Sequence, residues 1–447
     1  MRALFLIAAA SVALAAPANG ETLKDALSTA YQTNPTIRAE RARLRAIEES
    51  KAQAWAGALP QISANGSYSK TDSQQTALFT GTPSQIDSNI SPLIGAVQAE
   101  QPVFTGFRNF NAIKQAHARV RAGGAQLASV EQQVLRDVAG AYFNVQLNMA
   151  IYDLNKRNVA VLMRQKEMAS ARFEVGEITR TDVAQADARL AEARANLTNA
   201  QGNLAIARAS YARLVGQMPG DLEPVETLPD LPENLEAAHA IAGEFAPPLI
   251  AAREQSEISR RQVNIARGAL LPSVSLTAGY QYADEPSSFV LQQEEFSYGV
   301  RASMPIFLGG LNYSRVREAK ALHASDRSRI VEAERQVDEN VVSAWESLVA
   351  SQAVIKSSQS AVEANQLALN GVRQEAMLGT RTTLDVLDAE QELLNAEVRL
   401  ARAHRDAQTA AYGLLAAVGL LTPEAVGIES LDADPENGGE LLDSLRR

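Results

Sequence analysis

The chain of 447 residues contains no cysteine, few aromatic residues and, beyond its N-terminus, no apolar run long enough to cross a membrane as a helix. The missing cysteine excludes disulfide bonds, thiolate metal sites and a lipid attached through an N-terminal cysteine. The formal net charge of −10 argues against nucleic acid as a partner, because nucleic-acid binding requires a basic surface.

The one hydrophobic run lies at the N-terminus, which reads MRALFLIAAASVALAAPANG. It has a single basic residue, Arg2, followed by a short apolar segment and then small residues. This pattern is typical of a secretory signal peptide cleaved after Ala18 or Gly20, and the run is too short for a membrane anchor. We therefore expect residues 1–20 to be removed and the mature protein to be exported.

Proline is absent from two long stretches, residues 103–218 and 306–422, and glycine is sparse inside them. Because proline breaks helix interiors, both stretches can be mostly helical. The two stretches also match each other, with equivalent landmarks at one constant separation: Pro102 and Pro305, Tyr142 and Trp345, Gly176 and Gly379, Gly216 and Gly419. Such self-similarity indicates an internal duplication.

The duplication divides the mature chain into a first repeat, 21–219, and a second repeat, 247–422. Each is expected to contain a helix, two strands, a long helix, a turn and another helix. A proline-rich linker, 220–246, joins them, and an acidic tail, 423–447, follows. The connection between the two strand-forming segments is shorter in the second repeat, which predicts a surface loop there.

Apolar and polar residues alternate in the segments around 274–282 and 296–304, and more weakly around 62–68 and 97–99. A period of two predicts strands with one apolar face, long enough to cross a bilayer when tilted. An ordinary soluble sheet packed on the helices is the alternative. Four strands cannot close a barrel, and an open edge in lipid leaves backbone groups unpaired. Membrane strands would therefore require several chains to share one barrel.

Heptad patterns follow each proposed turn. Apolar residues recur every seven positions from Val183 to Tyr211 and from Val386 to Leu414, with alanine at most positions three residues later. This spacing predicts coiled coils in which helices approach closely, with the preceding long helix as the antiparallel partner. We interpret these apolar stripes as helix-packing surfaces without a catalytic role.

An exported chain with two duplicated halves, each with two membrane-length strands and a long coiled-coil hairpin, resembles the TolC family of outer-membrane efflux and secretion channels. Its most specific parts are RFEVGEITRTDV, from Arg172, and LGTRTTLDVLDA, from Leu378, which are similar to the family's two periplasmic hairpin turns around Gly176 and Gly379. The resemblance implies a mainly α fold with a β-barrel portion: four strands per chain in a shared twelve-stranded trimeric barrel, and antiparallel coiled-coil helices forming a periplasmic α-barrel.

The resemblance also implies a function and partners. The protein would be a passive exit duct of a tripartite efflux pump or type I secretion system in the outer membrane of a Gram-negative bacterium, extending into the periplasm. Its partners would be two further copies of itself, outer-membrane lipid, a periplasmic adaptor protein and an inner-membrane transporter of ABC or RND type. No cofactor is implied.

Two acidic residues, Asp385 and Asp388, open the last long helix. Thr382 with Asp385, and Thr179 with Asp182, fit a helix-capping pattern, but Asp388 lies one turn further along, where capping does not explain it. By resemblance, Asp385 and Asp388 form acidic rings at the periplasmic aperture. Clustered carboxylates would attract cations, so we expect a cation-selective pore.

The resemblance also assigns a gate. Arg381 matches the family's gate arginine, and Thr181 and Asp182 match its partners on a neighbouring hairpin, which charge-assisted hydrogen bonds would hold shut. A solvated surface arginine is the alternative. One departure affects this transfer: Ala376 stands where the family can carry a tyrosine that also ties the hairpins together.

Two other classes of function compete with the duct. A soluble periplasmic coiled-coil scaffold or adaptor would lack membrane-facing strands. A hydrolase using Asp385 and Asp388 would need a nucleophile or a metal, but the four histidines show no metal-ligand spacing and no nucleophile motif is present. We therefore expect no catalytic residue and no metal site.

Overall fold

The computed structural model describes residues 20–428, except 80 and 226. The expected signal peptide and most of the acidic tail lie outside the described residues. The chain divides into two compact units. The sheet unit comprises Thr36–Val130 and Glu236–Val341, and the hairpin unit comprises Met1–Pro35, Glu131–Leu235 and Val342–Arg447. Two 67-residue helices, α3 (Arg108–Glu174) and α7 (Leu311–Met377), contribute residues to both units.

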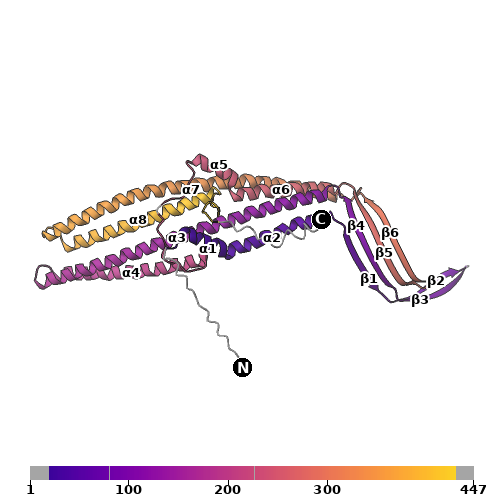
Figure 1. The fold of residues 1–447 in the computed structure, drawn as a ribbon, viewed down its shortest axis with the longest axis horizontal. Coiled ribbons are helices and arrows are strands. Elements are labelled where there is room, and N and C mark those ends of the chain that lie inside the picture. Colours follow the sequence, from indigo (N-terminus) through magenta and orange to yellow (C-terminus); the bar gives the residue numbers. More distant parts are fainter. Residues whose placement is uncertain (1–19, 80, 226, 429–447) are drawn as a thin grey trace, which may run out of the picture. The chain divides into compact units, whose positions relative to one another are not determined.

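The sheet unit contains a four-stranded antiparallel sheet in the order β1-β4-β5-β6 (Figure 1). Its strands are β1 (Gln61–Tyr68), β4 (Leu93–Phe104), β5 (Ser273–Ser287) and β6 (Val290–Ser303). They cover the four segments in which the sequence predicts strands. The outer edges of β1 and β6 pair with no other strand in the described part of the chain.

The strand register sorts the side chains of this sheet onto two faces, because directly paired residues point to the same side. Ala64 pairs with Val97, Val97 with Tyr280, and Tyr280 with Phe296, so one face carries an apolar row across all four strands. The row on the opposite face consists of Ser63, Gln98, Gly279 and Ser297. The apolar face is exposed in the single chain: Phe296, Tyr298 and Val300 are 70%, 82% and 69% accessible.

A second sheet occupies the connection between β1 and β4. Strands β2 (Thr71–Phe79) and β3 (Thr82–Ile90) pair with each other as a two-stranded ribbon rather than forming the expected surface loop (Figure 1). The Ser88 hydroxyl lies 2.5 Å from that of Ser288 in the turn after β5. The second repeat has only a tight turn here, between β5 and β6. The ribbon therefore accounts for the extra length of the first repeat.

Helices α2 (Pro35–Ala56), α5 (Leu235–Phe245) and α6 (Pro247–Gly268) complete the sheet unit with the first parts of α3 and α7. Helix α5 falls within the stretch expected as a linker. Arg121 of α3 donates two hydrogen bonds to Glu254 of α6, at 2.9 and 2.7 Å. Polar contacts of this kind link the long helices to their shorter neighbours.

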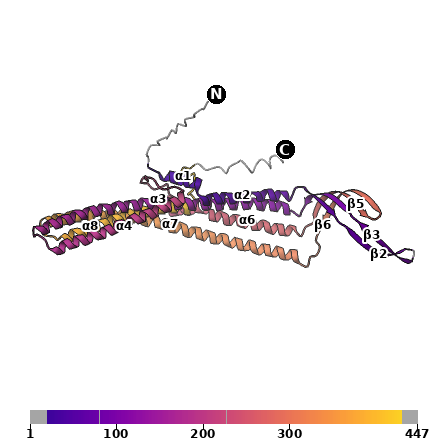
Figure 2. The ribbon, with the colours of Figure 1, turned by 90° about the horizontal axis from the view of Figure 1, so that it is seen from below.

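The hairpin unit contains α1 (Leu23–Thr33), α4 (Arg180–Val215), α8 (Thr383–Ala417) and the remainder of α3 and α7. Helix α4 returns along α3, and α8 returns along α7 (Figures 1 and 2). The heptad positions are mostly buried: in α4 these are Ala186, Leu190, Ala193, Ala200, Leu204, Ala207 and Tyr211. Helix α4, with its stripe of alanines, also packs against α8 of the second hairpin. The heptad pattern alone does not predict this contact.

An aromatic core forms the other end of the hairpin unit. Tyr142 and Tyr211 are fully buried, with ring centroids 6.5 Å apart. The Tyr142 hydroxyl lies 2.8 and 2.7 Å from the carbonyl oxygens of Glu21 and Glu223, which share its one hydrogen. The Tyr211 hydroxyl donates to the Glu21 carboxylate at 2.6 Å. Burial raises the pKa of both tyrosines. These bonds attach the start of the described chain and the inter-repeat linker to the long helices.

Between residues 20 and 428, positions 80 and 226 aside, no helix combines the length and apolar character that crossing a membrane requires.

Candidate functional site

The two hairpin turns have the same local design. Gly176 and Gly379 adopt left-handed conformations, with φ of 79° and 78°, a region that favours glycine. In the first turn, Gly176 N donates to Phe173 O at 2.9 Å; in the second, Gly379 N donates to Ala376 O at 3.1 Å. These bonds satisfy carbonyls at the ends of α3 and α7 and reverse the chain within a few residues. Both glycines thus lie where the repeat pattern places the turns.

Each returning helix begins with a capping box. The Thr179 hydroxyl accepts from Asp182 N, and Asp182 in turn accepts from Thr179 N at 2.8 Å. Thr382 and Asp385 do the same at the start of α8, where Asp385 Oδ2 accepts from Thr382 N at 2.8 Å. These backbone hydrogen bonds, reinforced by the threonine hydroxyls, hold the pKa of Asp182 and of Asp385 below the ordinary value. Asp385 therefore stays ionised at neutral pH.

Asp388 has a different partner. Its carboxylate accepts a hydrogen bond from Arg189 Nη2 of α4 at 2.8 Å, and the side chains are 53% and 36% exposed. The bond joins the second hairpin to the first. Arg189 also lies 3.4 Å from Glu192, one turn along α4. Asp388 thus forms an ion pair between the hairpins, whereas Asp385 caps its own helix.

Arg381 pairs with a neighbour in its own turn. Its Nε donates to Glu375 Oε2 at 2.8 Å, and this bond raises the pKa of the guanidinium. Thr181 is exposed in the first turn of α4, next to Asp182. Contacts of Arg381 with Thr181 and Asp182 would join it to another hairpin and remain a prediction.

An apolar cluster lies beside the Arg189–Asp388 pair. Leu387 of α8 is 2% exposed and packs with residues of the first hairpin: Leu162, Ala169, Ala186, Leu190 and Ala193. Sequence reasoning found the heptad positions but missed Leu387 and Arg189 as contacts between hairpins. Their partners lie about 200 residues away in the sequence, and a heptad pattern alone does not say which helix faces which stripe. Only the pairing of α4 with α8 shows them together.

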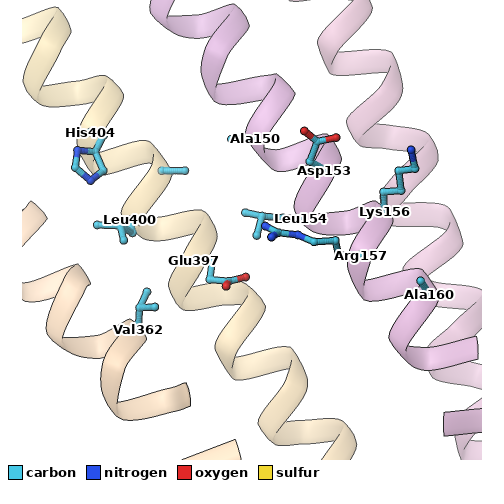
Figure 3. Close-up of a pocket in the computed structure, with 11 residues that line it drawn as sticks. Ala150, Asp153, Leu154, Lys156, Arg157, Ala160, Val362, Glu397, Leu400 and His404 are labelled. Atoms are coloured by element: carbon cyan, nitrogen blue, oxygen red, sulfur yellow. The ribbon is translucent and has the colours of Figure 1, made fainter. Parts of the chain in front are cut away.

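A groove of about 870 Å³ lies further along the same helices, between α3 and α8, with Val362 of α7 among its lining residues (Figure 3). Leu154 and Leu400 line it from opposite sides. The Arg157 guanidinium and the Glu397 carboxylate point toward one another across it (Figure 3). The walls are thus apolar in the middle, with charges of both signs, which suits packing between helices better than capture of a small ligand.

Within the described ranges, no group of three or more histidine or acidic side chains is placed to hold a metal ion. The acidic residues of the turns serve as helix caps and ion-pair partners. The chemistry of the tip is therefore electrostatic: it can attract, repel and pair charges.

Comparison with known proteins identifies the family. The profile described as "Outer membrane efflux protein" matches residues 26–217 and 242–420. The outer membrane efflux protein BepC of Brucella suis is 32% identical over 93% of this chain and 89% of its own length. The outer membrane protein TolC of Vibrio cholerae is 25% identical over 94% of this chain and 95% of its own.

Among solved structures, the outer membrane protein VceC of Vibrio cholerae superposes with a TM-score of 0.76, covering 89% of this chain and 96% of its own at 23% identity. This likeness shows that the fold is shared. Both curated relatives are named as outer membrane proteins, one of them as an efflux protein. The chain belongs to the outer membrane efflux protein family, and it is a TolC-like channel of the outer membrane that serves efflux or secretion.

Proposed function

We propose that three copies of the chain assemble into one continuous duct, whose periplasmic entrance is lined by the hairpin tips. One observation carries this proposal: among the described residues, the four-stranded sheet has two edges that pair with no further strand, and it has an exposed apolar face. In a bilayer the apolar face would be satisfied by lipid, but each unpaired backbone group would cost several kcal/mol. A further copy supplies the missing partners.

The strand directions support closure by rotation. Strand β1 is antiparallel to β4, β4 to β5, and β5 to β6, so β1 and β6 run in opposite directions. Copies related by rotation about a common axis then place β6 of one chain antiparallel to β1 of the next, which continues the same hydrogen-bond pattern. The family resemblance supports three copies, which would give a closed sheet of twelve strands with its polar face inside.

The channel works with partner proteins. We infer that these are a periplasmic adaptor protein and an inner-membrane transporter of ABC or RND type, which provides the energy. The duct itself would be passive, with the helix caps, ion pairs and packed stripes of the hairpins serving its architecture.

At the entrance, Asp385 and Asp388 would recur three times around the axis and form two acidic rings. Arg381 would act as a latch by bonding to Thr181 and Asp182 of a neighbouring hairpin. The Arg381 side chain is 50% exposed beside its 2.8 Å bond to Glu375, so a second partner can approach the guanidinium. Such rings would select cations and bind multivalent cations from the periplasm.

Single-channel recording of purified protein in planar bilayers tests this function. The wild type is expected to conduct, to prefer cations and to be blocked by a trivalent cation added on the periplasmic side. Replacing both Asp385 and Asp388 by alanine should abolish the block while leaving the assembled channel intact. Unchanged block and selectivity in this double variant would refute the acidic rings, and a wild type that never conducts would refute the duct.

A further inference from the structure

We propose that Arg189 and Asp388 form a clasp that holds the two helical hairpins of each chain together in the closed channel, and that opening the clasp leaves the Asp388 carboxylate of the acidic ring without its counter-charge. The proposal rests on the duct and the acidic entrance proposed above. It assigns a role to Arg189, and it gives Asp388 a different role from that of Asp385.

The geometry of the clasp is that of a direct link between hairpins. Arg189 lies on α4 and Asp388 on α8, and their charge-assisted hydrogen bond measures 2.8 Å. The adjacent residue, Leu387, inserts among Ala186 and Leu190 of α4. The ion pair therefore sits at the rim of an apolar contact. Separating α4 from α8 must break both the ion pair and this contact.

Four further ion pairs described near the tip each lie within one hairpin. Lys166 with Asp187 joins α3 to α4 at 2.5 Å, and Arg373 with Glu390 joins α7 to α8. The pairs Arg172–Glu177 and Arg381–Glu375 each lie inside a single turn. These contacts can survive when the hairpins separate as rigid pairs of helices. The Arg189–Asp388 bond cannot.

Two positions near the clasp make no side-chain bond between the two hairpins of one chain in the described structure. Ala376, at the end of α7, has only a methyl group and can make no side-chain hydrogen bond. Asp182, at the start of α4, already accepts both the amide and the hydroxyl of Thr179 through one oxygen. Neither residue links the hairpins of one chain in the described structure.

The clasp also affects the charge of the entrance. While it is closed, the guanidinium of Arg189 compensates the Asp388 carboxylate. Asp385 is held ionised by its helix cap and keeps its charge in both states. Opening would therefore add one uncompensated negative charge per chain at the depth of Asp388. The open entrance would then select cations more strongly than the closed one.

The test compares single-channel recordings of full-length wild type with the variants Arg189→Ala, Asp388→Ala and the charge swap Arg189→Asp/Asp388→Arg. Lys166→Ala is the matched control, since its side chain is 39% exposed against 36% for Arg189 and its ion pair lies within one hairpin. Both clasp variants are expected to raise the open probability about two- to fivefold, the range for an exposed ion pair. The charge swap should restore low open probability, and Lys166→Ala should leave it unchanged.

The ion selectivity of the variants distinguishes loss of the clasp from a general loosening of the hairpin tip. Arg189→Ala leaves Asp388 uncompensated and should raise the cation-to-anion permeability ratio, whereas Asp388→Ala should lower it. The proposal is overturned if Arg189→Ala leaves the open probability unchanged, if Lys166→Ala raises it equally, or if the two clasp variants shift selectivity in the same direction. A wild type that forms no channel would instead refute the proposed duct, so the two failures are distinguishable.

Discussion

Gly106 and Gly268 meet at the junction where the strands of the sheet unit give way to helices. A Cβ atom added to Gly106 would lie 2.3 Å from the Gly268 carbonyl oxygen, and one added to Gly268 would lie 2.4 Å from the Gly106 carbonyl oxygen. Gly106 also has a φ of 63°, in the left-handed region. Two segments from different repeats therefore approach each other so closely that their backbones leave no room for a Cβ atom.

Replacing Gly106 or Gly268 by alanine is expected to destabilise the protein by about 1–3 kcal/mol, because backbone atoms must shift to admit the new methyl group. The measurement is thermal unfolding of detergent-solubilised protein followed by circular dichroism. Gly124→Ala is the control, since its position in α3 is open and helical, and alanine there should stabilise by about 0.5–1 kcal/mol. Equal melting temperatures for all three variants would contradict the close contact.

The two capping boxes make the hairpin tip sensitive to acid only at low pH. The pKa of Asp182 and of Asp385 is lowered in the folded chain, chiefly by the backbone amides of Thr179 and Thr382. A lowered folded pKa contributes stability that is fully present above the unfolded value, near 3.8, and is lost as the pH falls through the folded value. The caps should therefore work unchanged from pH 7 down to about pH 5.

Thr179→Ala tests the first cap. At pH 6 it should lower the stability of α4 by about 1 kcal/mol, because the hydroxyl no longer accepts from Asp182 N. The difference between variant and wild type should shrink as the pH falls through the lowered pKa of Asp182, because protonation of the carboxylate weakens the wild-type box itself. Hydrogen exchange of amides 180–186, corrected for intrinsic rates, reports the effect. A difference that grows on acidification would mean that the cap does not depend on the carboxylate.

Helices and strands whose apolar residues recur with a clear period were predictable from the sequence. Those without such a pattern were not. Val274, Leu276 and Ala278 alternate with small polar residues, and the strand they predict is β5. The ribbon of β2 and β3 was missed because TDSQQTALF and TPSQIDSNI are mostly polar on both faces, so no alternation marks them. Their pairing with each other, rather than burial of an apolar face, forms this sheet.

The contact between α4 and α8 was unpredictable for a different reason. Alanine at every seventh position of α4 indicates that another helix packs closely against it. The pattern does not say whether that helix is α3 or α8. Asp388 drew attention because capping did not explain it, yet its partner Arg189 looks like any exposed arginine of a polar helix face. Only tertiary packing, through Leu387 and its neighbours, brings the two charges into contact.

The register of the sheet predicts opposite effects for neighbouring positions of β6. Val300 lies on the apolar face and is 69% exposed, whereas Ser297 lies on the polar face. Val300→Arg should reduce insertion into the outer membrane, since an arginine facing lipid costs up to about 2–4 kcal/mol at the bilayer midplane and less toward the interfaces. Ser297→Arg should insert normally and reduce cation conductance. The urea-resistant membrane fraction and single-channel currents measure the two effects, and equal loss of insertion would argue against the assigned faces.

For the whole molecule, the two repeats produce an incomplete structure. Duplication brings β1 and β4 of the first repeat together with β5 and β6 of the second in one sheet, and it places two hairpins side by side at the tip. The four strands still leave two edges that pair with nothing in the described chain. The free edges follow from the strand count, but the number of copies that satisfies them depends on strand tilt and stagger, which period-two patterns do not encode.

The absence of cysteine makes the assembly directly testable. In one chain, β1 and β6 are three strand spacings apart, or about 14 Å, which exceeds the roughly 7 Å that a disulfide can bridge. One cysteine in β1, at Ser63, combined in turn with one at successive positions of β6 from Ser297 to Ser303, can therefore cross-link only between chains. At the matching register, oxidation in membranes should give bands of one, two and three chains and no larger species. A ladder continuing beyond three chains, or no cross-link at any register, would show that the free edges are satisfied in another way.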